Sequence, residues 1–525
     1  MDNVRAKSEE LAKSLWDIAN EFRGNMDASE FKNYILGLIF YRYLSERTEN
    51  YMDDLLKDDG ITYKESLADA NYAETVKRWS IDHLGYIILP ENMWNSLIEK
   101  IGAAEFSIED LEIAVNSLTA STIGQESEAA FKGLFNDMNL KADHLGREVS
   151  DRTELISKVM LKIDNLGFDV KDTTFDYLGT AYMQLIGLFQ SGAGKKAGEF
   201  FTATCASKLV ARLACVGRSE VKNACDPCAG SGSLLLEVKN YLAAHKVGHF
   251  YSQELNSTTY NLNRMNMLLH GVAYKQFTAY NDDTLKNDNF YENGKPVMFD
   301  IQVSNPPYSA PNSAYSDSFL EDARYSSCGV LAPKTKADLQ FVLHMVHHMA
   351  DDGVISVLLP HGVLFRGNAE EKIRKYLIDN LNVLDAVVGL PANLFHGTSI
   401  PVVCLVFRKG RNGNSGNVMF IDASKDFIPG KQMNSLSDEQ IARIVDTYAE
   451  RKDIDKFARV VSIDEIKENN YNCNIPRYVD TSEPDVEINI PQTVEYIKEI
   501  DKDIEKAETE LKSMFTELGI EFPGL

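Results

Sequence analysis

Residues 221–237 read Val-Lys-Asn-Ala-Cys-Asp-Pro-Cys-Ala-Gly-Ser-Gly-Ser-Leu-Leu-Leu-Glu, and this stretch indicates the fold. Val221 to Cys225 predicts a short strand, and the apolar residues after Ser233 predict a helix. The turn from Asp226 to Gly232 is built of small residues, which let a ligand approach the backbone, and the helix after it presents free N–H groups. In a doubly wound sheet, such a turn is the usual cofactor-binding site. We therefore expect a doubly wound, Rossmann-like α/β domain.

Polar residues stand at the ends of four successive predicted strands. The first strand ends at Asp226 and the second at Glu254, about as far along the chain as a ribose-binding carboxylate is expected. The third leads to Asp283 and the fourth to Asn305. Because open α/β sheets bind ligands at their carboxyl strand ends, we expect these four residues around one site. The alternative is that the acids only cap helices.

The fourth strand ends in Asn305-Pro306-Pro307-Tyr308, which we interpret as the catalytic segment. The prolines cannot extend the sheet, and the residue before a proline is held extended, so Asn305 sits on stiff backbone. An exocyclic nucleobase amine is a poor nucleophile because its lone pair is delocalised. The Asn305 side-chain oxygen and the Pro306 carbonyl could accept its N–H bonds and localise that lone pair. Tyr308 offers a ring face to an unstacked base, with no use for its hydroxyl. An ordinary strand-to-turn junction is the alternative.

The chain is acidic, which limits how it could bind DNA. It has 525 residues, with Lys+Arg 54 against Asp+Glu 78 and a net charge of −24. A protein that holds duplex DNA alone normally shows a basic footprint, so a DNA substrate would require a local basic patch or another subunit. The start of the chain has no signal core, and no run is as long as a membrane span. Seven scattered cysteines indicate free thiols in a reducing cytoplasm. No second cysteine pair or histidine cluster accompanies Cys225 and Cys228, so we expect no metal.

The chain divides into three predicted domains. Residues 1–165 show apolar stripes at helical spacing and predict a separate all-helical domain with no chemistry of its own. Residues 166–480 contain the predicted strands, and the glycine-rich loop 410–416 predicts a hairpin between strands 401–408 and 418–421. Residues 481–525 predict a helical tail, with apolar residues alternating by three and four between Ile497 and Met514. We expect this seam to dock on a partner helix, with packing on its own chain as the alternative.

Three motifs together resemble one known family. Asp226 to Gly232, Asn305 to Tyr308 and Leu390-Pro-Ala-Asn-Leu-Phe395 are similar to the modification subunit of type I restriction–modification systems. Those proteins are adenine-N6 DNA methyltransferases that use S-adenosylmethionine. The resemblance covers nearly the whole chain, including Leu15-Trp-Asp-Ile-Ala19 near the start and Asn472 to Tyr478 before the tail.

The resemblance implies a cofactor site and a set of partners. It makes residues 166–480 the methyltransferase domain, and it implies two such chains around one DNA-specificity subunit, joined by nuclease–translocase subunits on double-stranded DNA. The family usually has proline after its Phe-Thr pair, whereas Ala203 follows Thr202 here. The strand-end residue Asp226 is added to the contacts that the resemblance implies, and Asp283 is expected near the adenine. The S-adenosylmethionine contacts are then Glu199, Phe200, Phe201, Thr202, Ala203, Thr204, Asp226, Ser231, Gly232, Ser233, Glu254 and Asp283.

Three other functions remain open on the sequence. Protein glutamine N5 methyltransferases share the Asn-Pro-Pro-Tyr motif, although the large helical domain argues against that substrate. A non-catalytic scaffold is a second alternative, and the intact Asn305 and Tyr308 argue against it. Pro227-Cys228 is the nucleophile motif of cytosine C5 methylation, but Cys228 lies inside the glycine turn, so we interpret it as a packing residue.

Overall fold

The computed structural model describes residues 2–19, 28–166, 177–192, 202–242, 246–395, 399–431, 433–482 and 489–521. The chain forms two compact units, Met1–Asp480 and Thr481–Leu525. Among the helices described, none is long and apolar enough to cross a membrane.

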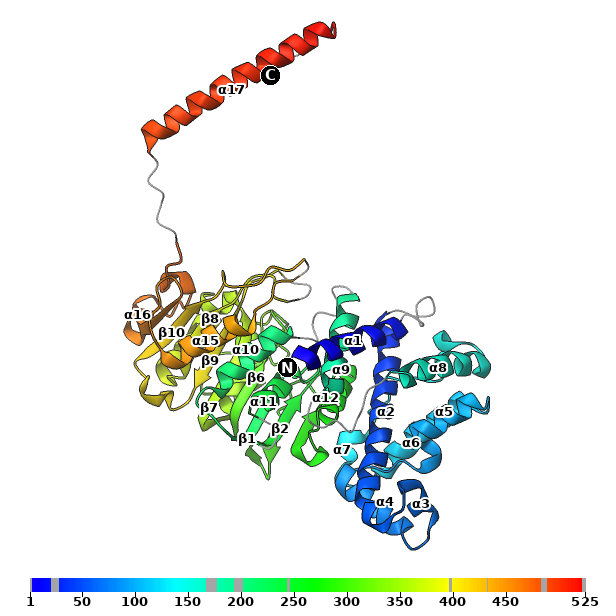
Figure 1. Ribbon diagram of the computed structural model, residues 1–525. Coiled ribbons are helices and arrows are strands. Elements are labelled where there is room, and N and C mark those ends of the chain that lie inside the picture. Colours follow the sequence, from blue (N-terminus) through cyan, green and yellow to red (C-terminus); the bar gives the residue numbers. More distant parts are fainter. Residues whose placement is uncertain are drawn as a thin grey trace. The chain divides into compact units, whose positions relative to one another are not determined.

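A nine-stranded sheet forms the centre of the first unit (Figure 1). Its strand order is β11-β10-β8-β9-β7-β6-β1-β2-β3. β9 runs antiparallel to both of its neighbours and β11 runs antiparallel to β10, while the other pairs are parallel. A separate small sheet pairs β4 with β5. The strands are β1 Val221–Asp226, β2 Val247–Gln253, β3 Phe277–Tyr280, β4 Tyr291–Glu292, β5 Lys295–Pro296, β6 Phe299–Ser304, β7 Met349–Pro360, β8 Leu384–Gly389, β9 Val402–Arg408, β10 Asn417–Asp422 and β11 Ala458–Ser462.

Both faces of this sheet are covered, as the sequence predicted for a doubly wound fold. Within β7, Val354 and Leu358 belong to one core, whereas Ile355 and Leu359 belong to the other. The alternation follows from the pleat, which points successive side chains to opposite faces. The first core is shared with α9, α10, α11, α12 and α15, and the second with α13, α14 and α16. These helices are α9 Tyr177–Gly192, α10 Thr204–Cys215, α11 Ser233–Leu242, α12 Ser257–Leu269, α13 Asp338–His347, α14 Ala369–Lys375, α15 Asp438–Glu450 and α16 Ile463–Glu468.

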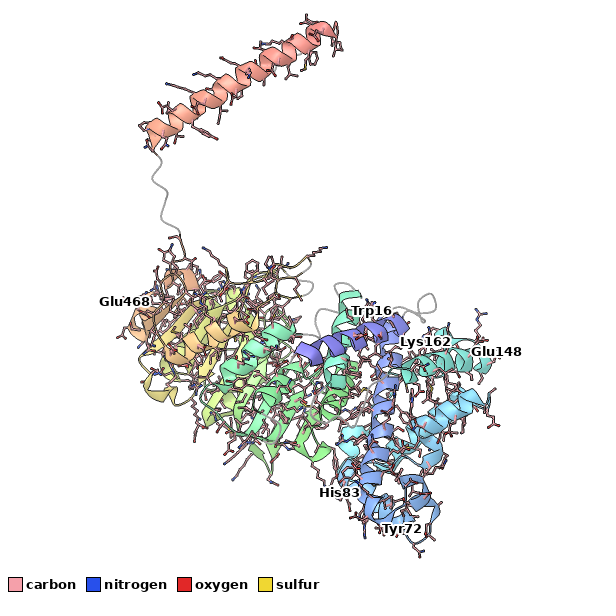
Figure 2. All side chains as sticks on the ribbon, viewed as in Figure 1. Trp16, Tyr72, His83, Glu148, Lys162 and Glu468 are labelled. Carbon is pink, nitrogen blue, oxygen red and sulfur yellow. The ribbon has the colours of Figure 1, made fainter. Side chains whose placement is uncertain are left out.

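The N-terminal region is helical, as predicted, and it packs around α2. From Phe31 to Leu44 most side chains of α2 are buried, which suits a helix that is apolar on several faces. Tyr41 in this stretch is fully buried and donates its hydroxyl to the carbonyl of Asn92 at 2.8 Å. Trp16 of α1, labelled in Figure 2, lies 5.3 Å from the ring of Phe189 on α9, so this region joins the sheet domain directly. The helices are α1 Asp2–Ala19, α2 Ala28–Leu56, α3 Tyr63–Ala68, α4 Ala73–Leu84, α5 Trp94–Gly102, α6 Ile108–Ser121, α7 Glu128–Phe131 and α8 Val149–Asp164.

The predicted hairpin between residues 401–408 and 418–421 is wrong. β9 and β10 do not pair, because β8 lies between them in the sheet. The glycine-rich loop instead contacts the start of β8, where Arg411 donates to Asp385 at 3.0 Å. Within the loop, Arg411 also donates to the Asn414 carbonyl at 3.0 Å. Asp385 is buried on β8, so it needs a cationic partner, and the loop supplies one.

The second unit contains one long helix, α17 Ile490–Glu517. Asn489 caps it by accepting from the Gln492 N–H at 3.2 Å. No residue of α17 is buried in the structure. Its apolar residues include Ile497, Ile500 and Ile504, which are 51%, 42% and 50% exposed.

Candidate active site

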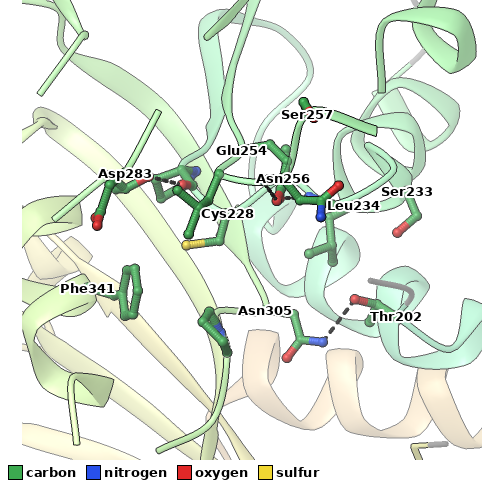
Figure 3. A pocket seen from close by; sticks show the side chains of 16 residues that line it. Thr202, Cys228, Ser233, Leu234, Glu254, Asn256, Ser257, Asp283, Asn305 and Phe341 are labelled. Carbon is green, nitrogen blue, oxygen red and sulfur yellow. Dashed lines mark hydrogen bonds between the residues drawn. The ribbon is translucent and has the colours of Figure 1, made fainter. Parts of the chain in front are cut away.

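A cavity of about 540 Å³ lies where β1, β2, β3 and β6 end (Figure 3). Figure 3 shows Asp283 and Phe341 toward one end, and Ser233 and Thr202 toward the other. Proteins commonly bind ligands of cofactor size in clefts of this volume. The residues that line it are Thr202, Pro227, Cys228, Ala229, Gly230, Ser233, Leu234, Glu254, Leu255, Asn256, Ser257, Asp283, Thr284, Asn305, Pro307 and Phe341.

Glu254 ties the end of β2 to the glycine turn. One carboxylate oxygen accepts from the Gly230 N–H at 2.9 Å and the other from the Asn256 N–H at 2.8 Å. Burial raises the pKa of Glu254, and these backbone bonds oppose that rise. Each oxygen keeps a further lone pair, so the residue can brace the turn and still accept from a ligand hydroxyl.

The turn itself requires glycine at position 232. Gly232 has a φ of +83°, and a Cβ there would lie 2.7 Å from the side-chain oxygen of Asn263. Only glycine adopts this backbone conformation without strain, so the turn can bend back and leave the first N–H groups of α11 facing the cavity edge.

Asp226 lies behind the cavity and is fully buried. One oxygen accepts from the Cys228 N–H at 3.0 Å and from the Ser304 hydroxyl at 2.9 Å. Within the described part of the chain the other oxygen has no partner. Burial raises the pKa of this carboxyl to about 7. Asp226 therefore braces the glycine turn against the end of β6, the strand that carries Asn305.

Asn305 lines the cavity with its side-chain amide held by two hydroxyl groups. Its NH2 group donates to Thr202 Oγ1 at 3.0 Å, drawn as a dashed line in Figure 3, and its oxygen accepts from the Tyr308 hydroxyl at 2.6 Å. The Tyr308 ring meets Phe395 edge to face at 6.2 Å. The sequence assigned no use to the Tyr308 hydroxyl, and in the structure it fixes which way the Asn305 oxygen points.

The segment before α10 is described only in part. Glu199, Phe200 and Phe201 lie outside the described residues. Ala203 is buried at the start of α10, and Thr204 is exposed. Ala203 has a φ of −53° and a ψ of 134°, which proline can also adopt. Alanine in place of the family's proline therefore leaves this backbone conformation unchanged.

Comparison with known proteins places the chain in a family. The model of the N-6 DNA methylase family matches residues 173–486, and that of the HsdM N-terminal domain matches residues 11–163. The MpnII methylase subunit of a type I restriction enzyme from Mycoplasma pneumoniae is 35% identical over 98% of this chain and 97% of its own length. The chain belongs to the N-6 DNA methylase family. It is a type I restriction–modification methylase subunit, and so an adenine-N6 DNA methyltransferase.

A solved relative agrees with this assignment. The type I methyltransferase subunit from Streptococcus thermophilus is 40% identical, with a TM-score of 0.84, over 90% of this chain and 100% of that one. The resemblance drawn from the three motifs and the predicted fold class are thus confirmed. DNA adenine, rather than protein glutamine, is the substrate of the methylase.

Cys228 lines the cavity of the methylase but is not suited to attack a base. Burial raises the pKa of its thiol well above the usual range, and the nearby Asp226 carboxylate acts in the same direction. A cysteine nucleophile requires the thiolate. The structure therefore favours the interpretation of Cys228 as a packing residue over that of a C5-methylation nucleophile.

A buried group of Asp288, His344 and His348 was not anticipated from the sequence. His348 and Asp288 lie 2.9 Å apart, and Arg324 lies 3.9 Å from the same carboxylate oxygen and donates to His344 at 3.2 Å. Burial opposes ionisation of Asp288, but the His348 hydrogen bond and the neighbouring His344, His348 and Arg324 side chains lower its pKa to about 2. Arg324 also donates to the Thr284 carbonyl at 2.8 Å, so the group anchors the loop beside Asp283.

Sequence reasoning missed several residues of the cavity. Leu255, Asn256 and Ser257 directly follow Glu254, and the helix cap at Asn256 was a local signal for them. Phe341 comes from α13, far along the chain from the glycine turn, and no local pattern marked it. Conversely, Pro306 and Tyr308 do not line the cavity. Pro306 follows Asn305 in the chain, and Tyr308 hydrogen-bonds to the Asn305 side chain.

Proposed function

We propose that this methylase binds S-adenosylmethionine in the 540 Å³ cavity and methylates N6 of an adenine taken out of the DNA duplex. The observation that carries the proposal is the Asn305 amide, held at a proline-stiffened strand tip beside the glycine turn. When bound, S-adenosylmethionine supplies a methyl group on a positive sulfonium.

The donor groups of the cavity match the parts of this cofactor. Asp283 and Phe341 supply a hydrogen-bonding group and a ring for an adenine, and Glu254 supplies acceptors for ribose hydroxyls. Ser233 and the start of α11 lie toward the other end, where the amino-acid part would fit. The residues present therefore fit the cofactor that the family implies.

Asn305 prepares the target nitrogen. The side-chain oxygen and the Pro306 carbonyl accept the two N–H bonds of the adenine amine and concentrate its lone pair on nitrogen. S-adenosylmethionine held in the cavity would supply the methyl group for a new C–N bond at this nitrogen, and the electron pair of the broken methyl–sulfur bond would leave with the sulfur. The nitrogen becomes acidic as it gains positive charge, so water can take the proton without a strong base. Tyr308 stacks on the extruded ring.

We also propose the partners that its family implies. Two copies assemble with one specificity subunit, which reads double-stranded DNA and supplies much of the phosphate attraction for a chain whose net charge is −24. Nuclease–translocase subunits join this complex for restriction. The seven cysteines are free thiols, which supports a cytoplasmic location.

One assay tests the proposal. Purified chain, its specificity subunit, duplex DNA with the target site and methyl-labelled S-adenosylmethionine are incubated, and digested nucleosides are resolved by mass spectrometry. We expect label in N6-methyladenine, and none when the specificity subunit is omitted. Label in 5-methylcytosine, or in protein alone, would overturn the assignment.

A further inference from the structure

Lys32, in the first turns of α2, lies against the methyltransferase domain. It lines a small cavity of about 20 Å³ whose apolar wall comes from α2, α9 and α12. The polar wall comes from Ser231 of the glycine turn and from Thr259. In the chain, Ser231 lies between Gly230 and Ser233, and Thr259 lies two residues after Ser257; Gly230, Ser233 and Ser257 all line the main cavity. The apolar lining residues are Leu36, Ile186, Phe189 and Leu262.

The ammonium group of Lys32 has no partner among the described residues. Burial lowers its pKa, and only the charge of Asp137 opposes that shift. No hydrogen bond joins Asp137 to Lys32 among the described residues, and the Asp137 oxygens accept from Thr258 and Asn261, each at 2.7 Å. A largely buried cation with no hydrogen-bonded carboxylate is unfavourable, and an anion at this position would compensate for its burial.

A second group at the same place also lacks a partner. The Ser231 hydroxyl is buried, with the residue 2% exposed, and no described atom bonds to its oxygen. The N–H groups of the first turn of α11 follow two residues later and have no acceptor within the helix. Together with Lys32 they form a set of donors suited to a carboxylate.

The position of these donors within the site indicates which carboxylate group they would bind. With an adenine at the Asp283 and Phe341 end and a ribose at Glu254, the remainder of the cofactor extends toward Ser233 (Figure 3). The methionyl carboxylate is the only anionic group of S-adenosylmethionine. We propose that Lys32, a residue of the helical N-terminal region, binds this carboxylate together with the Ser231 hydroxyl. The inference rests on the proposed function, in which S-adenosylmethionine occupies the main cavity.

The test compares two ligands that differ only in the carboxylate. Dissociation constants are measured by titration calorimetry on the full chain with S-adenosylmethionine and with its decarboxylated analogue. We expect Lys32→Met to weaken S-adenosylmethionine binding by about 10- to 100-fold, the range for a charge-assisted hydrogen bond, and to change the analogue by less than about 2-fold. Lys32→Arg should recover much of the loss. Lys64→Met, at an exposed lysine of α3, is the matched control and should bind as wild type does.

The other possible results of these titrations can be distinguished from one another. Equal weakening of both ligands by Lys32→Met would mean that Lys32 supports the fold and not the carboxylate, and would overturn the inference. If Lys32→Met does not fold, the wild-type comparison still decides, because equal affinity for the two ligands excludes a carboxylate site. If wild type binds neither ligand, the proposed cofactor itself fails, and the inference falls with it.

Discussion

At the scale of single residues, the position of the Asn305 oxygen controls the chemistry. The strand and the two prolines place the residue, but they do not decide which end of its amide faces the substrate. Thr202 accepts from the NH2 group, and the Tyr308 hydroxyl donates to the oxygen. Since an amide nitrogen cannot accept a hydrogen bond and the oxygen can, this orientation leaves the oxygen's second lone pair for the adenine amine.

Asn305→Ala should therefore slow methyl transfer without releasing the cofactor. It removes an acceptor used mainly in the transition state, and losing one such preorganised group costs about 10²–10³ in rate. The measurement is single-turnover transfer to target DNA in the assembled complex, with S-adenosylmethionine affinity determined in parallel. A near-normal rate of methyl transfer by Asn305→Ala would contradict the proposed mechanism.

Thr202→Val and Tyr308→Phe test the orientation of the amide. Each removes one neutral hydrogen bond, which contributes about 0.5–1.5 kcal/mol, so each should slow transfer by about 2- to 10-fold. The sequence alone predicted full tolerance of Tyr308→Phe, because only the ring face was considered. Tyr308→Ala should be worse than Tyr308→Phe, since stacking on a base contributes about 1–3 kcal/mol. If Tyr308→Phe matches wild type, the hydroxyl bond has no catalytic role.

At the scale of elements, the sequence was informative where a pattern is local. Hydrophobic runs and the prolines after residue 304 predicted the strands β1 and β6 and the polar residues at their ends. The position of β8 between β9 and β10 was not predictable in this way. The loop that connects β9 to β10 instead contacts β8, where Arg411 donates to Asp385, a buried carboxylate distant in the chain. Such contacts between distant segments leave no periodic signal in the chain.

Asp226 couples two of these elements, and its burial gives a pH dependence of stability. Burial raises the pKa of this carboxyl from 3.8 to about 7. The folded state therefore keeps the proton where the unfolded chain releases it. The stabilisation is fully present below pH 3.8 and is lost as pH rises through about 7, by on the order of 4 kcal/mol.

Asp226→Asn should remove this dependence, because an amide does not titrate. The apparent Tm of the variant minus that of wild type should be more positive at pH 8 than at pH 5. Burial also raises the pKa of Glu237 to about 7, but that residue is present in both proteins and cancels in the difference. The same Tm difference at both pH values would show that Asp226 ionises in the ordinary range.

At the scale of the whole molecule, the site draws on parts of the chain that no motif connects. Phe341 reaches the cavity from α13, and Lys32 reaches the glycine turn from α2. Arg264 on α12 donates to the carbonyls of Ala129 and Lys132, each at 2.9 Å, which joins the helical region to the helix that follows Glu254. The sequence predicted a separate helical domain with no chemistry of its own, and the boundary at residue 165 stays a prediction.

The acidic chain also needs a surface for its partner, and α17 offers one. Ile497, Ile500, Ile504, Leu511 and Met514 are between 39% and 57% exposed and repeat at the spacing of a heptad seam. Burying such a seam against a helix of the specificity subunit would stabilise the complex by about 25 cal/mol per Å² of apolar surface removed from water. We therefore propose α17 as the docking element, as the sequence predicted.

Replacing Ile500 and Ile504 with Asp should abolish assembly and leave the chain folded, because neither side chain is buried. The measurement is co-purification with the specificity subunit, with circular dichroism and S-adenosylmethionine binding as checks on the fold. Lys502→Asp with Thr509→Asp is the matched control. These two positions lie on the side of α17 opposite the seam, since each residue advances the helix by about 100°. The control should still assemble. If the Ile500→Asp, Ile504→Asp protein also co-purifies, the specificity subunit docks elsewhere.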